Sequence, residues 1–374
     1  MKIREICNIT MGQSPSSVTY NGNGDGLPFF QGAADFGKKF PMTRVWCSSP
    51  LKIAYAGDIL ISVRAPVGTM NIATSECCIG RGLAAIKVDE DACDSNYFWF
   101  ALESKISELN NKGSGSTFKA ISKSILEETE IPLPELEEQR KIAKILTGIE
   151  NISFARQQQL AKLDELVKAR FVEMFGDIIH NDKNWEKYHF SDITSSRLGK
   201  MLDAKQQTGK HPFPYLANAN VQWFRFETDN LNRMDFNETE QVEFSLKDGD
   251  LLVCEGGEIG RCAVWHDQVQ PCYFQKALHR VRCNQETIVP DYLAWWFKFN
   301  CENNGFAAIE GAKATIAHLP GAKLKQLLVV VPSIELQYRF VDFIEQTDMV
   351  KVSVQKSLEQ LETLKKALMQ KYFG

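Results

Sequence analysis

The pattern of apolar and polar residues along the chain predicts short strands, short buried helices and two long helices. Four apolar runs bounded by glycine or charged residues predict strands: DILISV (58–63), AAIKV (84–88), LLVCE (251–255) and LLVVV (327–331). Aromatic residues at helical spacing predict two short buried helices: NYFWFALES (96–104) and DYLAWWFKF (291–299). Strands and helices are mixed along the chain, so the pattern indicates an α+β fold.

Two stretches have the spacing of long amphipathic helices of about 40 residues. In 333–374, steps of four and three residues predict a coiled-coil seam formed by Val350, Val354, Ser357, Leu361, Leu364 and Leu368. In the earlier stretch one face carries Ile142, Ile145, Ile149 and Ile152, followed by Leu160, Leu163 and Val167. Each helix has an apolar stripe that needs a partner. We therefore expect the two helices to pair with each other, in antiparallel orientation.

The chain repeats itself. LPELEEQRKIAKIL (133–146) returns as VPSIELQYRFVDFI (331–344), with Pro134 and Gln139 matched by Pro332 and Gln337 at an offset of 198 residues. The same offset relates 113–121 to 311–319 and 163–176 to 361–374. Upstream it falls to 195 for the aromatic helices, to 192 for GDILISVRAPVG (57–68) and GDLLVCEGGEIG (249–260), and to 186 for Pro28 and Pro214.

A repeat of this length predicts a duplicated architecture. We expect two similar α+β domains, 1–134 and 181–332, related by a pseudo-twofold axis and separated by helices at 135–180 and 333–374. The two domains are expected to share one strand order. The stretches between the matched motifs, such as 31–56 and 217–248, have almost nothing in common.

Composition limits the class of protein. A chain of 374 residues is long enough for two or three domains. Its formal net charge of −4 argues against a surface covered in positive charge but allows a local basic groove. No apolar run reaches the roughly 18 residues of a membrane span, and MKIREICNIT at the N-terminus lacks a secretory segment, so we expect a cytoplasmic protein without a membrane partner. The ten cysteines lack metal-ligand spacing and are expected to be reduced, with no bound metal.

Together these motifs resemble the specificity (S) subunit of type I restriction–modification systems. The resemblance lies in GDILISVRAPVG (57–68), GSGST (113–117), IPLPELEEQRKIAKIL (131–146), LDELVKARFVEMFGD (163–177) and their repetition. It implies two target-recognition domains, each reading one half of a bipartite double-stranded DNA target, and an antiparallel pair of spacer helices. It also implies that two methylation (M) subunits dock on the helices and that restriction (R) subunits complete the complex.

No motif in the sequence supplies catalysis. The [N/D]-P-P-[Y/F] tetrapeptide of adenine methyltransferases is absent, as is the G-x-x-x-x-G-K-[ST] phosphate loop. We therefore expect no cofactor in this chain, and S-adenosylmethionine, ATP and magnesium on the partner subunits. The chain alone should neither methylate nor cut DNA. The alternative is a structural adaptor built on a coiled coil that does not read DNA, which gel shifts with pooled duplexes would distinguish.

Candidate DNA contacts are basic and small polar residues of the variable loops, because such side chains reach phosphates and base edges. In the first domain they are Lys38, Lys39, Arg44, Arg64, Arg81, Lys112, Ser116, Thr117 and Lys119. In the second they are Lys200, Lys205, Lys210, Asn218, Asn220, Arg225, Arg261, Lys313 and Thr315. The position equivalent to Arg64 is Gly256, so Arg64 is not expected to be a contact common to both domains.

Candidate docking residues for the partner subunits lie on a second flank of each long helix, beside the expected seam. They are Ile142, Leu146, Ile149 and Leu160 in the first helix and Phe340, Phe343, Ile344 and Leu358 in the second. An apolar stripe wider than a two-stranded seam needs further cover, which the methylation subunits would provide.

Overall fold

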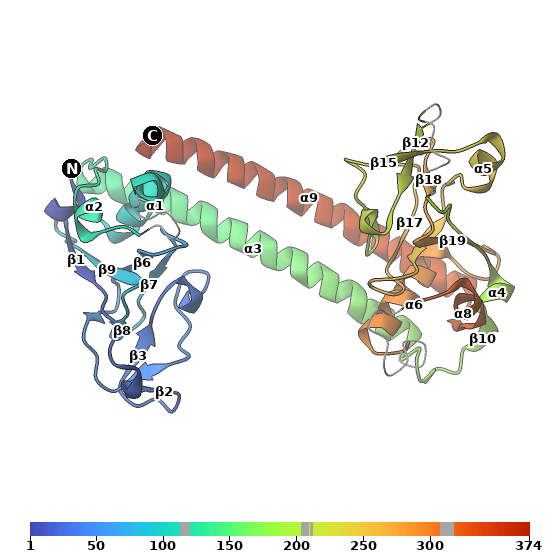
Figure 1. The fold of residues 1–374 in the computed structure, drawn as a ribbon, viewed down its shortest axis with the longest axis horizontal. Helices are drawn as coiled ribbons and strands as arrows, with labels where there is room; N and C mark the ends of the chain where they lie inside the picture. The colour runs from blue at the N-terminus through green and yellow to red at the C-terminus, as the bar shows by residue number, and fades with distance from the viewer. Residues whose placement is uncertain (113–119, 203–208, 210–211, 307–317) are drawn as a thin grey trace. The chain divides into compact units, whose positions relative to one another are not determined.

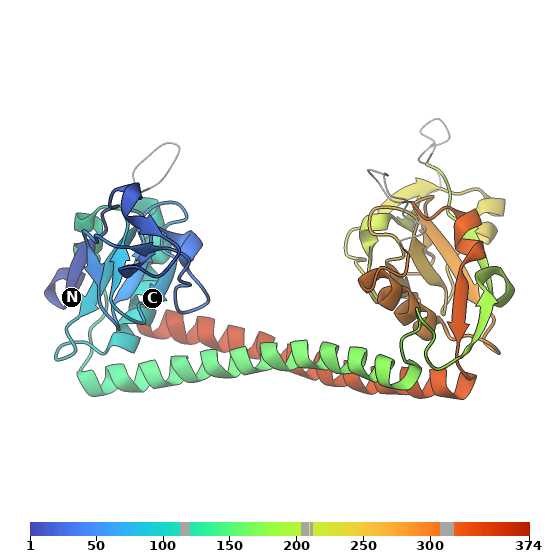
Figure 2. The ribbon, with the colours of Figure 1, turned by 90° about the horizontal axis from the view of Figure 1, so that it is seen from below.

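The computed structural model describes residues 1–112, 120–202, 209, 212–306 and 318–374. Two compact units make up the chain: unit 1 is Met1–Gln159 with Val354–Gly374, and unit 2 is Leu160–Ser353. Helices α3 (Leu136–Phe175) and α9 (Ile334–Phe373) have 40 residues each and are unbroken (Figures 1 and 2). Each unit therefore holds one globular part and one segment of each long helix. Among the described helices, none is long and apolar enough to cross a membrane.

The globular part of unit 1 contains two sheets. The main sheet has the order β1-β9-β6-β7, with β1 (Cys7–Met11), β6 (Ile59–Ser62), β7 (Met70–Ile72) and β9 (Leu83–Val88), all antiparallel. The second sheet has the order β2-β4-β3-β8-β5, with β2 (Tyr20–Asn21), β3 (Leu27–Phe30), β4 (Trp46–Cys47), β5 (Ile53–Ala54) and β8 (Cys77–Ile79). Helices α1 (Ser95–Lys112) and α2 (Lys123–Glu127) complete this part.

The globular part of unit 2 has a four-stranded main sheet like that of unit 1, with smaller additional sheets (Figure 1). Its main sheet has the order β11-β19-β16-β17, with β11 (Thr194–Leu198), β16 (Leu251–Cys254), β17 (Cys262–Val264) and β19 (Leu278–Cys283). Its second sheet has the order β15-β12-β18, with β12 (Pro212–Leu216), β15 (Asn232–Asp235) and β18 (Tyr273–Phe274). Two further sheets have two strands each: β13 (Val221–Gln222) with β14 (Arg225–Phe226), and β10 (Glu186–His189) with β20 (Leu328–Val331). Its helices are α4 (Phe190–Ile193), α5 (Glu238–Glu243), α6 (Pro290–Glu302) and α8 (Gly321–Gln326).

The two main sheets share strand order and register, so the internal repeat extends to the backbone. Ile59 pairs with Ile86 in unit 1, and Leu251 pairs with Val281 at the equivalent position of unit 2. The second sheets agree in an unusual detail, since β3 pairs with β8 in parallel and β12 pairs with β18 in parallel. The predicted common strand order is confirmed.

A buried glutamine fastens the start of each long helix to its globular part. Gln139 Oε1 accepts a hydrogen bond from Asp94 N at 2.9 Å, and its Nε2 donates to Pro134 O at 2.7 Å and to Ala92 O at 3.3 Å. Gln337 accepts from Val289 N at 2.9 Å and donates to Pro332 O at 2.9 Å and Thr287 O at 3.1 Å. These are equivalent partners, offset by 195 and 198 residues. The repeated proline–glutamine motif is thus a hydrogen-bonded fastening.

An aromatic contact holds the other end of each long helix. In unit 1, Phe373 at the end of α9 packs against Tyr97 of α1, with ring centroids 5.2 Å apart. In unit 2, Phe175 at the end of α3 packs against Tyr292 of α6 at 4.8 Å. Each long helix therefore begins at the glutamine of one unit and ends at the tyrosine of the other.

The predicted seam of the second long helix is only partly correct, because Val354, Leu361 and Leu368 lie on the less exposed face of α9 whereas Val350 and Leu364 do not. Val350 and Leu364 are 43% and 47% exposed, and Ile145 and Ile152 of α3 are 45% and 50% exposed. The less exposed face of α9 instead follows steps of three and four through Gln337, Phe340, Ile344, Thr347, Lys351, Val354, Leu358, Leu361, Lys365 and Leu368. Two lysines occupy seam positions, so a pattern of apolar residues alone selected the neighbouring face.

Carboxylates compensate the two seam lysines. Lys365 Nζ lies 2.8 Å from Glu150 Oε1 of α3 and 3.0 Å from Glu103 Oε1 of α1. Lys351 Nζ lies 2.9 Å from Asp164 of α3 and 3.1 Å from Asp348. Burial by itself lowers the pKa of Lys365, but the hydrogen bond and charge of Glu150, together with Glu103, outweigh it and raise the pKa. Both lysines therefore stay charged within the helix pair.

The fastening by glutamine predicts a loss of stability in Gln139→Leu. This change leaves the buried N–H of Asp94 without a partner, so the free energy of unfolding should fall by about 1–3 kcal/mol. Gln158→Leu, on an exposed position of the same helix, is the control and should change it by less than about 0.5 kcal/mol. Urea unfolding measures both variants. Equal effects would show that the hydrogen bonds of Gln139 are not what holds the helix start.

The seam lysines predict a non-additive result. Lys365→Met leaves Glu103 and Glu150 without their shared cation, and the free energy of unfolding should fall by about 1–3 kcal/mol because the site is only partly exposed. Adding Glu103→Gln and Glu150→Gln removes the uncompensated charge and should restore most of the loss. A triple variant no more stable than Lys365→Met in urea would contradict this account.

Candidate nucleic-acid interface

Five chain segments meet at one end of the main sheet in each unit, and we call this meeting point the junction. In unit 1 it comprises residues 12–14, 30–32, 62–64, 79–83 and 120–121; in unit 2 it comprises 199–201, 216–218, 254–256, 274–278 and 318–319. The segments are the end of the first strand of the main sheet, three loops that follow strands, and the segment before a short helix. The junction lies where the variable loops begin and end.

The junction is held by the same backbone hydrogen bonds in both units. In unit 1, Gly12 N donates to Leu83 O at 2.9 Å, Gly80 N to Phe30 O at 2.8 Å, Val63 N to Gly82 O at 2.9 Å and Ile121 N to Val63 O at 3.0 Å. In unit 2 the equivalent bonds are Gly199 N to Leu278 O at 3.0 Å, Gln275 N to Leu216 O at 3.1 Å, Glu255 N to Ala277 O at 3.0 Å and Leu319 N to Glu255 O at 2.7 Å. The backbone is therefore constant where side chains differ.

One glycine in each junction is required by close backbone approach. A Cβ at Gly12 would lie 2.1 Å from Gly80 O, and a Cβ at Gly199 would lie 2.3 Å from Gln275 O. Both contacts are with backbone, which cannot turn aside as a flexible side chain can. The two glycines thus occupy equivalent positions for the same steric reason.

The turn between the last two strands of each junction carries an exposed basic residue. Arg81 lies on the turn after β8, and its backbone N donates to Ser14 Oγ at 3.2 Å. Lys276 lies at the equivalent position after β18. Arg81 was among the predicted DNA contacts and Lys276 was not. The offset of 195 that relates the aromatic helices also pairs these two residues, so the sequence contained the signal.

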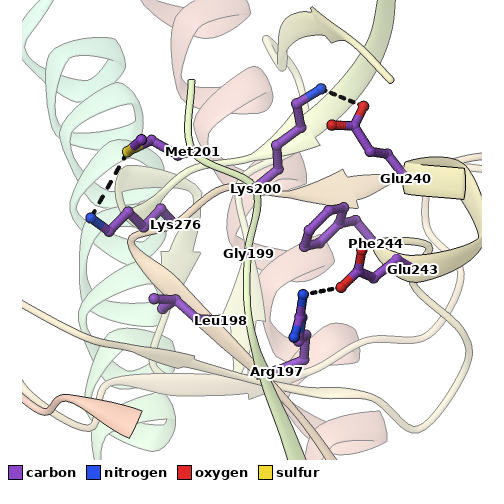
Figure 3. Close-up of a pocket in the computed structure, with 9 residues that line it drawn as sticks. All are labelled: Arg197, Leu198, Gly199, Lys200, Met201, Glu240, Glu243, Phe244 and Lys276. Carbon is purple, nitrogen blue, oxygen red and sulfur yellow. Dashed lines mark hydrogen bonds and ion pairs between the residues drawn. The ribbon is translucent and has the colours of Figure 1, made fainter. Parts of the chain in front are cut away.

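Lys200 was predicted to contact DNA, but its ammonium group faces the interior of unit 2. It is 7% exposed, and its Nζ donates to Asp235 O at 2.7 Å and to Glu240 Oε2 at 2.6 Å. Arg197 forms an ion pair with Glu243 nearby (Figure 3). A hollow of about 610 Å³ is lined by the two ion pairs, Lys200 with Glu240 and Arg197 with Glu243, and by Lys276. Lys276 differs from its neighbours in this hollow, because its Nζ contacts only Met201 Sδ, at 4.0 Å, among the described residues.

Two other predicted contacts of unit 2, Asn218 and Arg261, shape the loop that follows β16, and a third, Asn220, shapes the turn before β13. Asn218 Nδ2 donates to Gly256 O at 3.0 Å, and Arg261 donates to Asn218 O at 3.1 Å and to Glu258 Oε2 at 3.3 Å. Asn220 caps the short turn before β13 by accepting from Ala217 N at 2.9 Å. These polar groups fix the backbone of variable loops. Arg225 is exposed and lies 3.3 Å from Glu227.

The predicted contacts of unit 1 fall into two groups. Lys38 lies 3.9 Å above the ring of Phe154 and donates to Gln157 Oε1 at 3.1 Å, so it holds its loop against α3. Lys112 forms an ion pair with Glu108. The others have no carboxylate partner within the ranges that the structure describes, and they are Lys39, Arg44, Arg64 and Arg81. Seven predicted contacts lie outside the described residues: Ser116, Thr117, Lys119, Lys205, Lys210, Lys313 and Thr315.

The expected second flank of the long helices is largely covered within the chain itself. Of the eight predicted docking residues, Ile142, Leu146, Ile149, Phe340 and Leu358 are buried, and Leu160, Phe343 and Ile344 are half-buried. Ile142 and Leu146 belong to the core of unit 1 and Phe340 to the core of unit 2, while Leu358 lies on the less exposed face of α9. The apolar residues that α3 and α9 leave exposed are Ile145, Ile152, Phe154, Leu166, Val172, Tyr338, Met349, Val350, Val352 and Leu364.

The described residues offer no group of three or more His, Cys, Asp or Glu that could hold a metal ion. The structure describes all ten cysteines, and none of them forms a disulfide. Burial raises the pKa of the Cys254 thiol to about 11, against the opposing effect of Arg261. Seven of the ten cysteines are buried and pack as small side chains of the cores.

Comparison with known proteins finds similarity to specificity subunits of type I restriction enzymes. Residues 1–165 match the family model described as the type I restriction modification DNA specificity domain. A Methanocaldococcus jannaschii protein, provisionally named as the MjaX specificity subunit of a type I restriction enzyme, is 44% identical over 160 residues, which span 43% of this chain and 38% of that protein. The EcoBI specificity subunit of Escherichia coli is 22% identical over 98% of this chain and 84% of its own length.

A solved structure extends the likeness in fold to the whole chain. The S subunit of a type I restriction–modification system from M. genitalium has a TM-score of 0.61 and 16% identity, over 100% of this chain and 95% of that one. The match to the MjaIX specificity subunit of M. jannaschii, at 27% identity, covers 57% of this chain and 56% of that protein. The first 165 residues are therefore similar to the type I restriction modification DNA specificity domain, and the fold of the whole chain is similar to that of a solved S subunit.

Proposed function

We propose that the chain is the DNA-recognition subunit of a type I restriction–modification complex, in which each globular part reads one half of a bipartite double-stranded target. The observation that carries the proposal is the junction. It presents the same backbone in both units, and the loops that leave it have different sequences. Two globular parts with the same backbone at the junction can bind DNA in the same orientation, and their different loops can read different base sequences.

The long helices serve two further roles in the proposal. They set the separation of the two half-sites, because each is one continuous element that starts in one unit and ends in the other. They also dock two methylation subunits, through the exposed apolar residues of α3 and α9 rather than through the buried seam. Restriction subunits join the same complex.

The chain contributes no catalysis in this proposal. S-adenosylmethionine, ATP and magnesium belong to the partner subunits. A structural adaptor that does not read DNA would also use a helix pair. It has no need for two globular parts with matched junctions and unmatched loops, which supports the recognition role over the adaptor.

Exchange of one globular part tests the proposal directly. Residues 1–134 replaced by the equivalent segment of another specificity subunit should change one half-site and leave the other half-site and the spacer unchanged. The fastening survives such an exchange, because Gln139 bonds to backbone atoms that any such domain supplies. Sequencing of methylated genomic sites in cells that contain the partner subunits gives the target. A change in both half-sites, or in neither, would contradict the division of recognition.

A matched insertion tests the spacing role. Seven residues added after Gln159 in α3 and seven added after Ser353 in α9 preserve the steps of three and four along both seams. Seven residues lengthen a helix by about 10 Å, which corresponds to about three base pairs of duplex. The non-specific spacer should lengthen by about that amount, with both half-sites constant, in the same methylation assay. New half-sites at an unchanged spacing would contradict the spacing role.

A further inference from the structure

We infer that Arg81 and Lys276 are equivalent phosphate anchors, each binding the sugar–phosphate backbone of its own half-site. This inference rests on the proposed function and adds the residues that position each unit on the duplex. It separates contacts common to both half-sites from contacts that read bases.

The two residues occupy the same position of the same turn. Leu83 N donates to Gly80 O at 2.9 Å, and Leu278 N donates to Gln275 O at 3.0 Å, so each turn closes between its first and fourth residues. Arg81 and Lys276 are the second residues of these turns. The flanking residues are tied into the junction by backbone bonds, which fixes the Cα atoms from which the two exposed side chains extend.

The two residues also keep their charge available. Near Lys276, the cations of Arg197 and Lys200 are compensated by Glu243 and Glu240. Arg81 and Lys276 have no carboxylate partner among the residues that the structure describes. An uncompensated cation on a rigid turn can bind a phosphate oxygen without first breaking an internal ion pair.

Their equivalence indicates phosphate rather than bases as the ligand. Two half-sites with different sequences have only the sugar–phosphate backbone in common, and phosphate contacts position a protein without carrying sequence information. A basic residue kept at one position in two units with unmatched loops fits such a contact. Arg64 lacks this property, because its equivalent is Gly256, as the bridges Arg64–Ala120 and Gly256–His318 establish.

The test uses the complex with its methylation subunits and duplexes of the target mapped by methylation sequencing. Arg81→Gln, Lys276→Gln and the double variant are compared with wild type in binding titrations at several salt concentrations. Each lost phosphate contact should reduce the slope of log K against log salt by about 0.9, and the double variant by about twice that. Affinity for target and non-target duplexes should fall by the same factor.

The matched controls are Lys87→Gln and Lys247→Gln, exposed lysines at the opposite end of the same two main sheets. Their slopes should equal that of wild type, and thermal unfolding should show that all variants are folded. Two results would overturn the inference: a slope unchanged in the double variant, or a loss confined to the target duplex, which would make these residues base readers. A wild-type complex without any sequence preference would instead contradict the proposed function.

Discussion

The fastening of each long helix by a buried glutamine is the interaction on which the rest of the structure depends. Gln139 and Gln337 satisfy backbone groups of two different segments and thereby fix the direction in which each helix leaves its globular part. All their partners are backbone atoms, so the sequence of the globular part can vary without loss of the fastening. This explains why proline and glutamine recur at one offset while the basic residue Arg140 is replaced by Tyr338.

The junction applies the same principle at the opposite end of the globular part. Its hydrogen bonds join backbone atoms, and Gly12 and Gly199 are needed only because two chains approach too closely for a Cβ. Side chains at the junction are therefore free to differ, as Val63 and Glu255 do. A scaffold held by backbone contacts at both ends can change its loops without a change in fold.

Sequence patterns predicted the repeat, the long helices and the common strand order, because these depend on motifs that recur at fixed offsets. The sequence patterns gave wrong positions where a charged residue occupies a site that is usually apolar. Lys351 and Lys365 lie in the seam, and each has a carboxylate partner far away in the chain, Asp164 and Glu150, so the apolar pattern selected Val350 and Leu364 instead. Lys200 was misjudged for the same reason, since Glu240, which compensates it, is 40 residues away along the chain. Ion pairs between segments far apart in the chain produce no regular spacing of residues in the sequence.

The same ion pairs bear on how a chain of net charge −4 could recognise DNA. Many of its exposed or partly exposed cations are compensated internally, including Lys112, Arg225 and Arg261. Non-specific affinity grows with the number of phosphates that a protein neutralises. Few uncompensated cations at each junction would keep that affinity low, so the difference between target and non-target duplexes would depend on the loops that read bases. Internal ion pairs would then increase the ratio of target to non-target affinity. Further phosphate contacts would come from the partner subunits.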